Sequence, residues 1–156
     1  MNTEEQAKQY FNNGYNCAES VLLSVCCQMG YDPKEYGICI PRMATGFGGG
    51  IARNGGICGA LSGAIMAIGL ALGRDDAKES RDPCYPAADR LYNEFVERFG
   101  HSACRGLTGL DMKNEQDRQR YQEQVHNDRC VPMVCWTARR TAEIISEHSP
   151  GKPQTA

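Results

Sequence analysis

Apolar residues recur at helical spacing along most of the chain, and no segment shows the strong alternation that is typical of a strand. The clearest helical segment begins at Cys17. Asn16 precedes it, and Glu19 stands three residues after Asn16, which is the pattern of a capping box. The apolar positions that follow predict a helix that Gly30 ends: Ala18, Val21, Leu22, Val25, Cys26 and Met29.

Three further segments show helical spacing. Thr3 is expected to cap a helix that runs through Phe11, and residues 85–99 and 132–148 carry amphipathic patterns. The expected inner faces are Ala88, Leu91, Tyr92, Phe95 and Phe99 in the first of these, and Val134, Cys135, Ala138, Ala142 and Ile145 in the second. Residues 59–72 are almost wholly apolar, so we expect them to form a buried, glycine-rich helix at the centre of a bundle.

The remaining segments are mostly polar. Residues 101–111 are expected to form a loop or short turn, and residues 114–128 a solvated helix or mobile loop, because they offer little to bury. The composition of residues 149–156 predicts a disordered tail. The chain is therefore predicted to be all-α, with residues 1–148 forming a single-domain helical bundle around its central apolar helix.

Length and charge argue against some classes of partner. The chain has 156 residues and a formal net charge of −2, so it lacks the basic surface that favours nucleic acid or an anionic membrane. The apolar segment is too short and too rich in glycine for a membrane span. The first residues lack the basic and apolar regions of a secretory signal, which makes the cytoplasm the expected compartment. We expect no nucleic-acid partner and no membrane.

Nine cysteines are many for a cytoplasmic chain. Reducing conditions disfavour a disulfide scaffold, and an odd number fits full pairing poorly. Each thiol can be a small buried apolar group, a redox-active group or a metal ligand. Cys26 and Cys27 continue an apolar helix and are expected to pack in the core.

A glycine-rich segment leads into the apolar helix: residues 46–63 hold eight glycines and Cys58. Glycine lets a backbone approach a bulky group closely, and at positive φ it can aim successive N–H groups at one anion. The segment has no P-loop lysine motif and no preceding strand, which argues against a nucleotide. Tight packing is one explanation. The other is a cofactor pocket at the start of the helix, lined by Gly48, Gly49, Gly50, Gly55, Gly56 and Gly59.

Cys17 and Cys58 share a position at the start of a predicted helix. Free backbone N–H groups and the positive end of the helix dipole lie there, and both favour a thiolate. We therefore expect the pKa of both thiols to be lowered, with Cys58 the most reactive of the nine cysteines.

Four stretches that each contain a cysteine follow one another along the chain: "GYNCAESVL", "GFGGGIARNGGICGALSGA", "SACRGL" and "CVPMV". Over roughly residues 5–147 the chain resembles the redox-active protein family named for its pattern of Cys, Gly-Cys-Ala-x-x-Gly, Cys and Cys, with Ile57 in place of the glycine before the second cysteine. The resemblance implies redox activity and an iron–sulfur cluster. The cysteines that match the family pattern are Cys17, Cys58, Cys104 and Cys130, with Cys135 as an alternative to the last.

Three functions follow. Four thiolates are the usual ligands of an iron–sulfur cluster for electron transfer, and zinc uses the same ligands. Without metal, Cys17 and Cys58 could form a thiol–disulfide redox pair. A helical interaction module with structural cysteines is the third hypothesis. A redox protein is the expected partner, and the apolar central helix is compatible with a homodimer.

Overall fold

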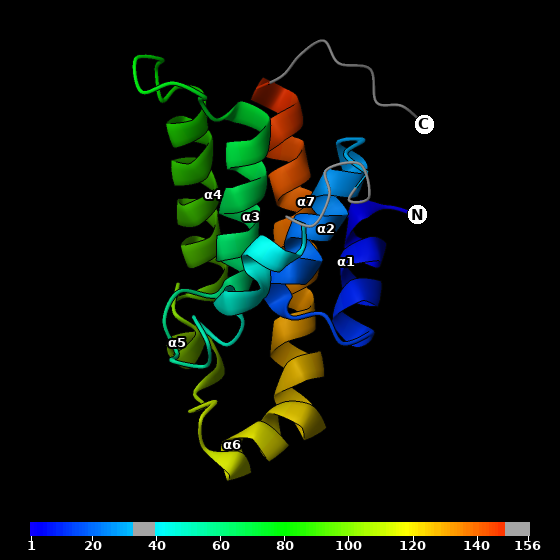
Figure 1. The fold of residues 1–156 in the computed structure, drawn as a ribbon. Helices are drawn as coiled ribbons and strands as arrows, with labels where there is room; N and C mark the ends of the chain where they lie inside the picture. The colour runs from blue at the N-terminus through cyan, green and yellow to red at the C-terminus, as the bar shows by residue number, and fades with distance from the viewer. Residues whose placement is uncertain (33–39, 149–156) are drawn as a thin grey trace.

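The computed structural model describes residues 1–32 and 40–148, so the predicted tail lies outside the described residues. Over these two ranges the protein is all-α, as the sequence pattern predicts, with one isolated bridge between Ile57 and Ala103. η2 is a 3₁₀-helix and η3 a π-helix. In chain order the elements (Figure 1) are α1 (Thr3–Asn12), α2 (Cys17–Gln28), η2 (Arg42–Phe47), α3 (Gly59–Leu72), α4 (Cys84–Phe99), α5 (Cys104–Thr108), α6 (Glu115–Arg120), η3 (Tyr121–Cys130) and α7 (Val131–His148).

α2, α3 and α7 pack against one another and form the middle of the bundle. α1 lies against α2 and α7, and α4 lies against α3 and α7. α5, α6 and η3 close one end of this bundle (Figure 1). Burial of apolar side chains between the helices is the main source of stability. The largest of the fully buried apolar side chains are Leu22, Leu61, Ile68, Leu91, Phe95 and Ile144.

The predicted start of α2 is confirmed, and that of α1 is corrected. Asn16 Oδ1 accepts the backbone N–H of Glu19 at 3.0 Å, and the Glu19 carboxylate accepts the backbone N–H of Asn16 at 2.9 Å. α1 is capped by Asn2, which forms a second capping box with Glu5. Thr3 is instead the first helical residue and is buried. Asn and Thr can both cap a helix, so the residue type alone did not distinguish them.

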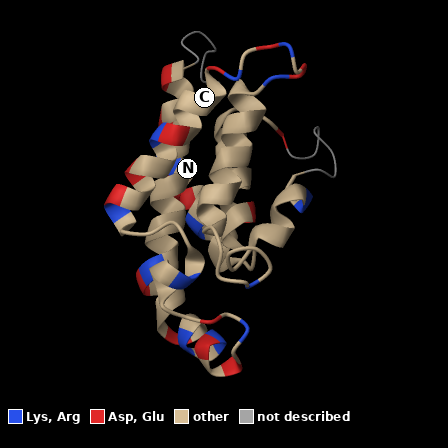
Figure 2. Ribbon diagram, turned by 90° about the vertical axis from the view of Figure 1, so that its left-hand side faces the viewer, with Lys and Arg blue, Asp and Glu red and all other residues tan. Residues whose placement is uncertain are grey.

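α3 has the predicted bounds, but it is not buried on all sides. Where it meets α2, a Cβ at Gly63 would lie 2.3 Å from the carbonyl oxygen of Ala18, so the two backbones touch. Elsewhere on α3, Ile65 and Leu70 are 37% and 41% exposed, and a Cβ at Gly69 would meet nothing within 4 Å. α3 carries no charge and stays tan in Figure 2. In the part of the chain that the structure describes, no helix is long and apolar enough to cross a membrane.

The polar segments fold as helices. Residues 114–128 form α6 and most of η3, which fits the expected solvated helix, and α5 occupies part of the expected loop at 101–111. Acidic and basic residues are frequent on α6 at one end of the molecule and on residues 74–82 at the other (Figure 2). The predicted inner face of α4 holds for Leu91 and Phe95 but is wrong for Tyr92, which is 41% exposed.

Candidate functional site

One cavity of about 660 Å³ lies where the starts of α2 and α3 meet α5 and η3. Four cysteines from four elements line it: Cys17 of α2, Cys58 before α3, Cys104 of α5 and Cys130 of η3. The structure therefore brings together the four cysteines that the sequence pattern groups. Further lining residues include Phe11, Asn16, Gly48, Gly49, Arg53, Gly59, Met112, Tyr121 and His126.

Cys17 and Cys58 meet because α2 and α3 pack closely at their starts. Cys17 is the first residue of α2, and Cys58 is the N-cap residue of α3. A Cβ at Gly59 would lie 2.3 Å from the Cys17 Sγ, so only glycine allows α3 to begin this close to the thiol. Cys58 is buried and Cys17 is half-buried.

Three glycines of the segment line the cavity, as predicted: Gly48, Gly49 and Gly59. A Cβ at Gly48 would lie 2.9 Å from Asn16 Nδ2, so this glycine packs on the cap of α2. The backbone N–H of Gly49 acts on the Cys17 thiol in the direction that lowers its pKa. These glycines bring main-chain donors up to the thiols.

The other three predicted glycines of the segment form a scaffold and do not line the cavity. Gly50, Gly55 and Gly56 are not among the lining residues, which corrects the sequence expectation. The Gly56 N–H donates to the Gly50 carbonyl at 2.9 Å, and the Gly56 carbonyl accepts the Cys104 N–H at 2.7 Å. A Cβ at Gly50 would lie 2.5 Å from the Gly56 oxygen and 2.8 Å from the Cys104 Cβ. These glycines let the segment lie against α5 and hold Cys104 beside the cavity.

Residues 49–53 of the glycine segment form a left-handed turn. φ is positive at five consecutive residues, and three of them are not glycine: Ile51 at 64°, Ala52 at 46° and Arg53 at 67°. A left-handed conformation costs an ordinary residue about 1–2 kcal/mol, and a β-branched residue such as Ile51 adopts it rarely. The turn places Ala52 and Arg53 on the rim of the cavity.

Cys130, and not Cys135, reaches the cavity. Cys135 lies in α7, and the charges that act on it are those of Glu4 and Lys8 in α1. The two cysteines are five residues apart, which on an ideal helix separates two side chains by about 140°. Burial raises the pKa of Cys130 to about 12.

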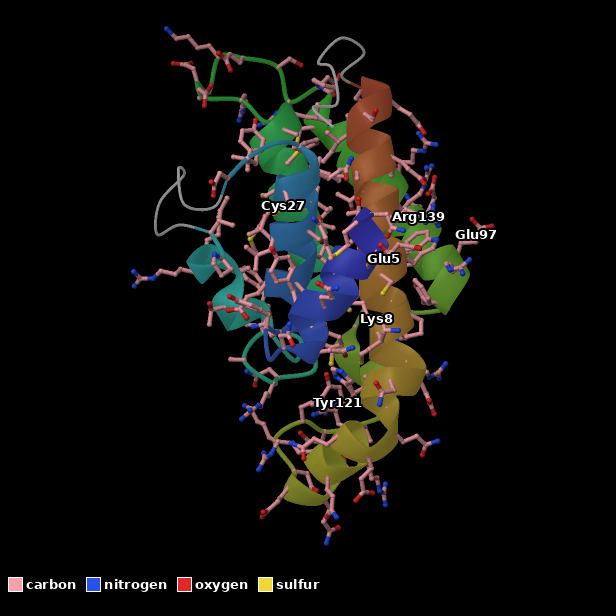
Figure 3. The ribbon with its side chains drawn as sticks, turned by 90° about the vertical axis from the view of Figure 1, so that its right-hand side faces the viewer. Glu5, Lys8, Cys27, Glu97, Tyr121 and Arg139 are labelled. Carbon is pink, nitrogen blue, oxygen red and sulfur yellow. The ribbon has the colours of Figure 1, made fainter. Side chains whose placement is uncertain are left out.

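Cys26 and Cys27 lie outside the cavity lining. Cys26 is fully buried, as predicted, and burial raises its pKa to about 12. Cys27 is only half-buried, which corrects the expectation of a core residue, and its Sγ lies 3.7 Å from the Tyr10 hydroxyl. Figure 3 shows Cys27 on α2, well away from Tyr121.

Burial, and not the helix start, governs the thiols of the cofactor-free chain. Desolvation is the largest influence on Cys58 and on Cys17, and it raises the pKa of both. Backbone N–H groups lower the pKa as expected, those of Ala60 and Leu61 at Cys58 and that of Gly49 at Cys17, but their effect is smaller. The expected low thiol pKa is therefore wrong, because the apolar surroundings outweigh the donors.

Tyr121 and His126 belong to the cavity, although the sequence analysis placed their segment in solvent. Both are half-buried on η3, and Phe11 of α1 stacks on the His126 ring with 4.3 Å between ring centroids. They are the only rings in residues 114–128. The contrast between these two rings and their mostly polar neighbours was the one signal in the sequence that could have assigned them to the cavity.

Comparison with known proteins adds a family. The sequence pattern of the family described as "Putative redox-active protein (C_GCAxxG_C_C)" matches residues 15–144, which include all four cavity cysteines. A relative in Archaeoglobus fulgidus, described as an uncharacterized protein, is 30% identical over 136 residues, and the alignment covers 79% of this chain and 88% of the relative. No solved structure matches this chain.

Proposed function

We propose that this chain, which belongs to the C_GCAxxG_C_C family of putative redox-active proteins, is an electron-transfer protein that binds an iron–sulfur cluster. The proposed ligands are Cys17, Cys58, Cys104 and Cys130. The observation that carries the proposal is that these four thiols, from four separate elements, line one cavity. Four cysteine thiolates are the common ligand set of such clusters.

The spacing of the cavity thiols favours a group of several atoms over a single ion. Four sulfurs that bind zinc all lie about 2.3 Å from one point. Among the residues that the structure describes, no group of three or more His, Cys, Asp or Glu side chains is close enough to hold a metal ion. Thiols that line one cavity without meeting at a single point support a cluster better than zinc.

The surrounding residues suit a bound anionic sulfur group. Gly59 leaves the space that any side chain would fill, beside the Cys17 Sγ. The N–H groups of Gly49, Ala60 and Leu61 donate toward two of the thiols, and donors of this kind tune the potential of an iron–sulfur centre. When bound, the cluster supplies one-electron transfer. The thiols are protonated in the free chain, so binding releases protons to solvent.

A metal-free thiol–disulfide function is the alternative, and the close approach of Cys17 to the start of α3 favours it. The Cys17 Sγ and Cys58 Sγ would form a bond while the disulfide of a partner protein is reduced to two thiols, so two electrons and two protons pass to the partner. The raised pKa of both thiols slows this exchange, because the thiolate is the attacking species.

Oxygen-free purification and reconstitution with ferrous iron and sulfide test the proposal. We expect iron and acid-labile sulfide in the wild-type protein, and a loss of both in Cys17→Ser, Cys58→Ser, Cys104→Ser and Cys130→Ser. The matched control is Cys135→Ser, which should keep both because Cys135 faces α1. Wild-type protein without iron and sulfide, or equal loss in Cys135→Ser and Cys130→Ser, would refute the proposal. One zinc per chain without sulfide would support zinc.

The partner and the oligomeric state are further parts of the proposal. An electron-transfer protein needs a second redox protein as donor or acceptor. The exposed apolar side chains of Ile65 and Leu70, on a helix without charged residues, support a homodimer. Light scattering on wild-type and Ile65→Lys protein tests the dimer, which the substitution should dissociate.

A further inference from the structure

Tyr121 occupies a special place among the cavity residues, because all four cavity thiols act on it. Burial and the nearby Cys130, Cys17, Cys104 and Cys58 all raise the pKa of its hydroxyl. The hydroxyl therefore keeps its proton at any physiological pH. Figure 3 shows Tyr121 at the cavity end of the molecule, below α1.

A chain of hydrogen bonds leads from Tyr121 to the surface. The Tyr121 hydroxyl lies 3.1 Å from His126 Nδ1, and His126 Nε2 lies 3.2 Å from Asn12 Oδ1. Asn12 is exposed at the end of α1. Phe11 stacks on one face of the imidazole, and the Tyr121 ring packs edge-on against it. The imidazole is therefore held in one orientation between the cavity and solvent.

The π-helical winding of η3 explains why these residues line one cavity. On an α-helix, positions 121 and 126 would project about 140° apart. A turn closed by i→i+5 hydrogen bonds brings the fifth residue along back over the first, so Tyr121 and His126 meet. Cys130, four residues further along the same segment, also faces the cavity.

We infer that Tyr121 and His126 form a proton relay that couples reduction of the group bound by the four cysteines to proton uptake from water. The inference rests on the proposed function. One electron comes from an external one-electron donor. A hydronium ion in the solvent gives one proton to Nδ1 of His126, so an N–H bond forms, one O–H bond of the hydronium ion breaks and a water molecule is left.

Protonation of His126 reverses the direction of its hydrogen bond with the Tyr121 hydroxyl. In the neutral imidazole, Nε2–H donates to Asn12 Oδ1, so Nδ1 accepts the Tyr121 O–H and the hydroxyl offers the cavity only a lone pair. In the imidazolium, Nδ1–H donates to the Tyr121 oxygen, and the O–H turns into the cavity. There it donates a hydrogen bond to the negative charge that the electron brings.

The groups that face His126 carry no charge that would offset its change of protonation. The groups that face it are Phe11 and Asn12 of α1 and Tyr121 of its own segment, none of which is charged. Burial lowers the pKa of His126, and no charged side chain among the described residues offsets that effect. The imidazole is therefore neutral at pH 7 and gains its proton when the charge in the cavity becomes more negative.

Potential titration of the cluster-loaded protein tests the relay. Between about pH 8 and about pH 5 we expect the equilibrium constant for one-electron reduction to rise about tenfold, which is a shift of about 59 mV. Tyr121→Phe and His126→Gln should keep iron and sulfide but lose most of this shift. Tyr85→Phe, on the exposed face of α4, and His148→Gln, at the end of α7, should keep it. Equal shifts in all five proteins would overturn the relay.

A second measurement needs no cluster. In the cofactor-free protein, imidazole nitrogen NMR should show the neutral form of His126 as the Nε2–H tautomer, held by Asn12 and Tyr121. A neutral Nδ1–H tautomer would overturn the relay, because Nδ1 could not then accept the Tyr121 proton. Failure of the proposed function is seen separately, as wild-type protein that binds no iron and sulfide.

Discussion

The glycine segment contains lining glycines and scaffold glycines, which are the same residue type and have different roles. Gly48, Gly49 and Gly59 face the cavity and bring backbone donors toward the thiols. Gly50 and Gly56 face away from it and pair with each other and with the start of α5. A run of glycines in a sequence can thus contain both a binding surface and the scaffold that holds it. The two kinds of glycine are told apart only by what a Cβ at each position would contact.

Substitution of a scaffold glycine should give the largest loss of stability. In Gly50→Ala the new Cβ would lie 2.5 Å from the Gly56 carbonyl oxygen, at a φ of +69°. Backbone strain and overpacking together predict a loss of about 3 kcal/mol in the free energy of unfolding. Urea denaturation measures it.

The control for this substitution is Gly46→Ala, at a position where a Cβ would meet nothing within 4 Å. It should change the free energy of unfolding by less than about 0.5 kcal/mol. Equal losses in the two variants would mean that the contact between the glycine segment and α5 does not stabilise the protein.

The buried thiols on the cavity side should make the cofactor-free protein sensitive to alkaline pH. The folded-state pKa of Cys130 is raised to about 12, above the unfolded value of about 8.5. Its contribution to stability is therefore present below the unfolded pKa and is lost as the pH rises through the folded pKa. Cys130→Ser should remove about 2 kcal/mol of the loss measured between about pH 8.5 and about pH 10. Parallel stability curves for the two reduced proteins would contradict this.

Two glycines of α3 offer a matched pair that separates binding from stability. Gly59→Ala places a Cβ 2.3 Å from the Cys17 Sγ, whereas Gly69→Ala enters open space on the same helix. Gly59→Ala should lose bound iron and sulfide while circular dichroism shows unchanged helix content. Gly69→Ala should keep the cluster and gain about 1 kcal/mol of stability, because alanine favours a helix. Loss of the cluster in both variants would exclude a specific role for Gly59.

The smallest expected effect is a gain in stability at the left-handed turn of residues 49–53. Ile51 is 49% exposed and has a φ of 64°, so Ile51→Gly should relieve backbone strain and stabilise the fold by about 1 kcal/mol. Ile57→Gly is the control, since Ile57 is also exposed but is not among the positive-φ residues, and it should destabilise. Thermal unfolding distinguishes the two. Destabilisation by Ile51→Gly would contradict the strained turn.

The sequence by itself determined what depends on neighbours along the chain. The bounds of α3, the capping box at Asn16 and Glu19, and the all-α class follow from residues within one or two turns of each other. The four cysteines of the cavity could also be grouped, because they stand in the order of a family pattern. The cap of α1 was missed because two adjacent residues, Asn2 and Thr3, can both serve as caps.

Only the tertiary structure decided what depends on residues distant in sequence. Burial by other elements raised the pKa of Cys58, and packing of α5 against the glycine segment decided which glycines line the cavity. The π-helical winding of η3 turned Tyr121 and His126 inward from a polar segment. Burial, dielectric surroundings and side-chain direction depend on how separate elements pack together, and the order of residues within one element does not specify that packing.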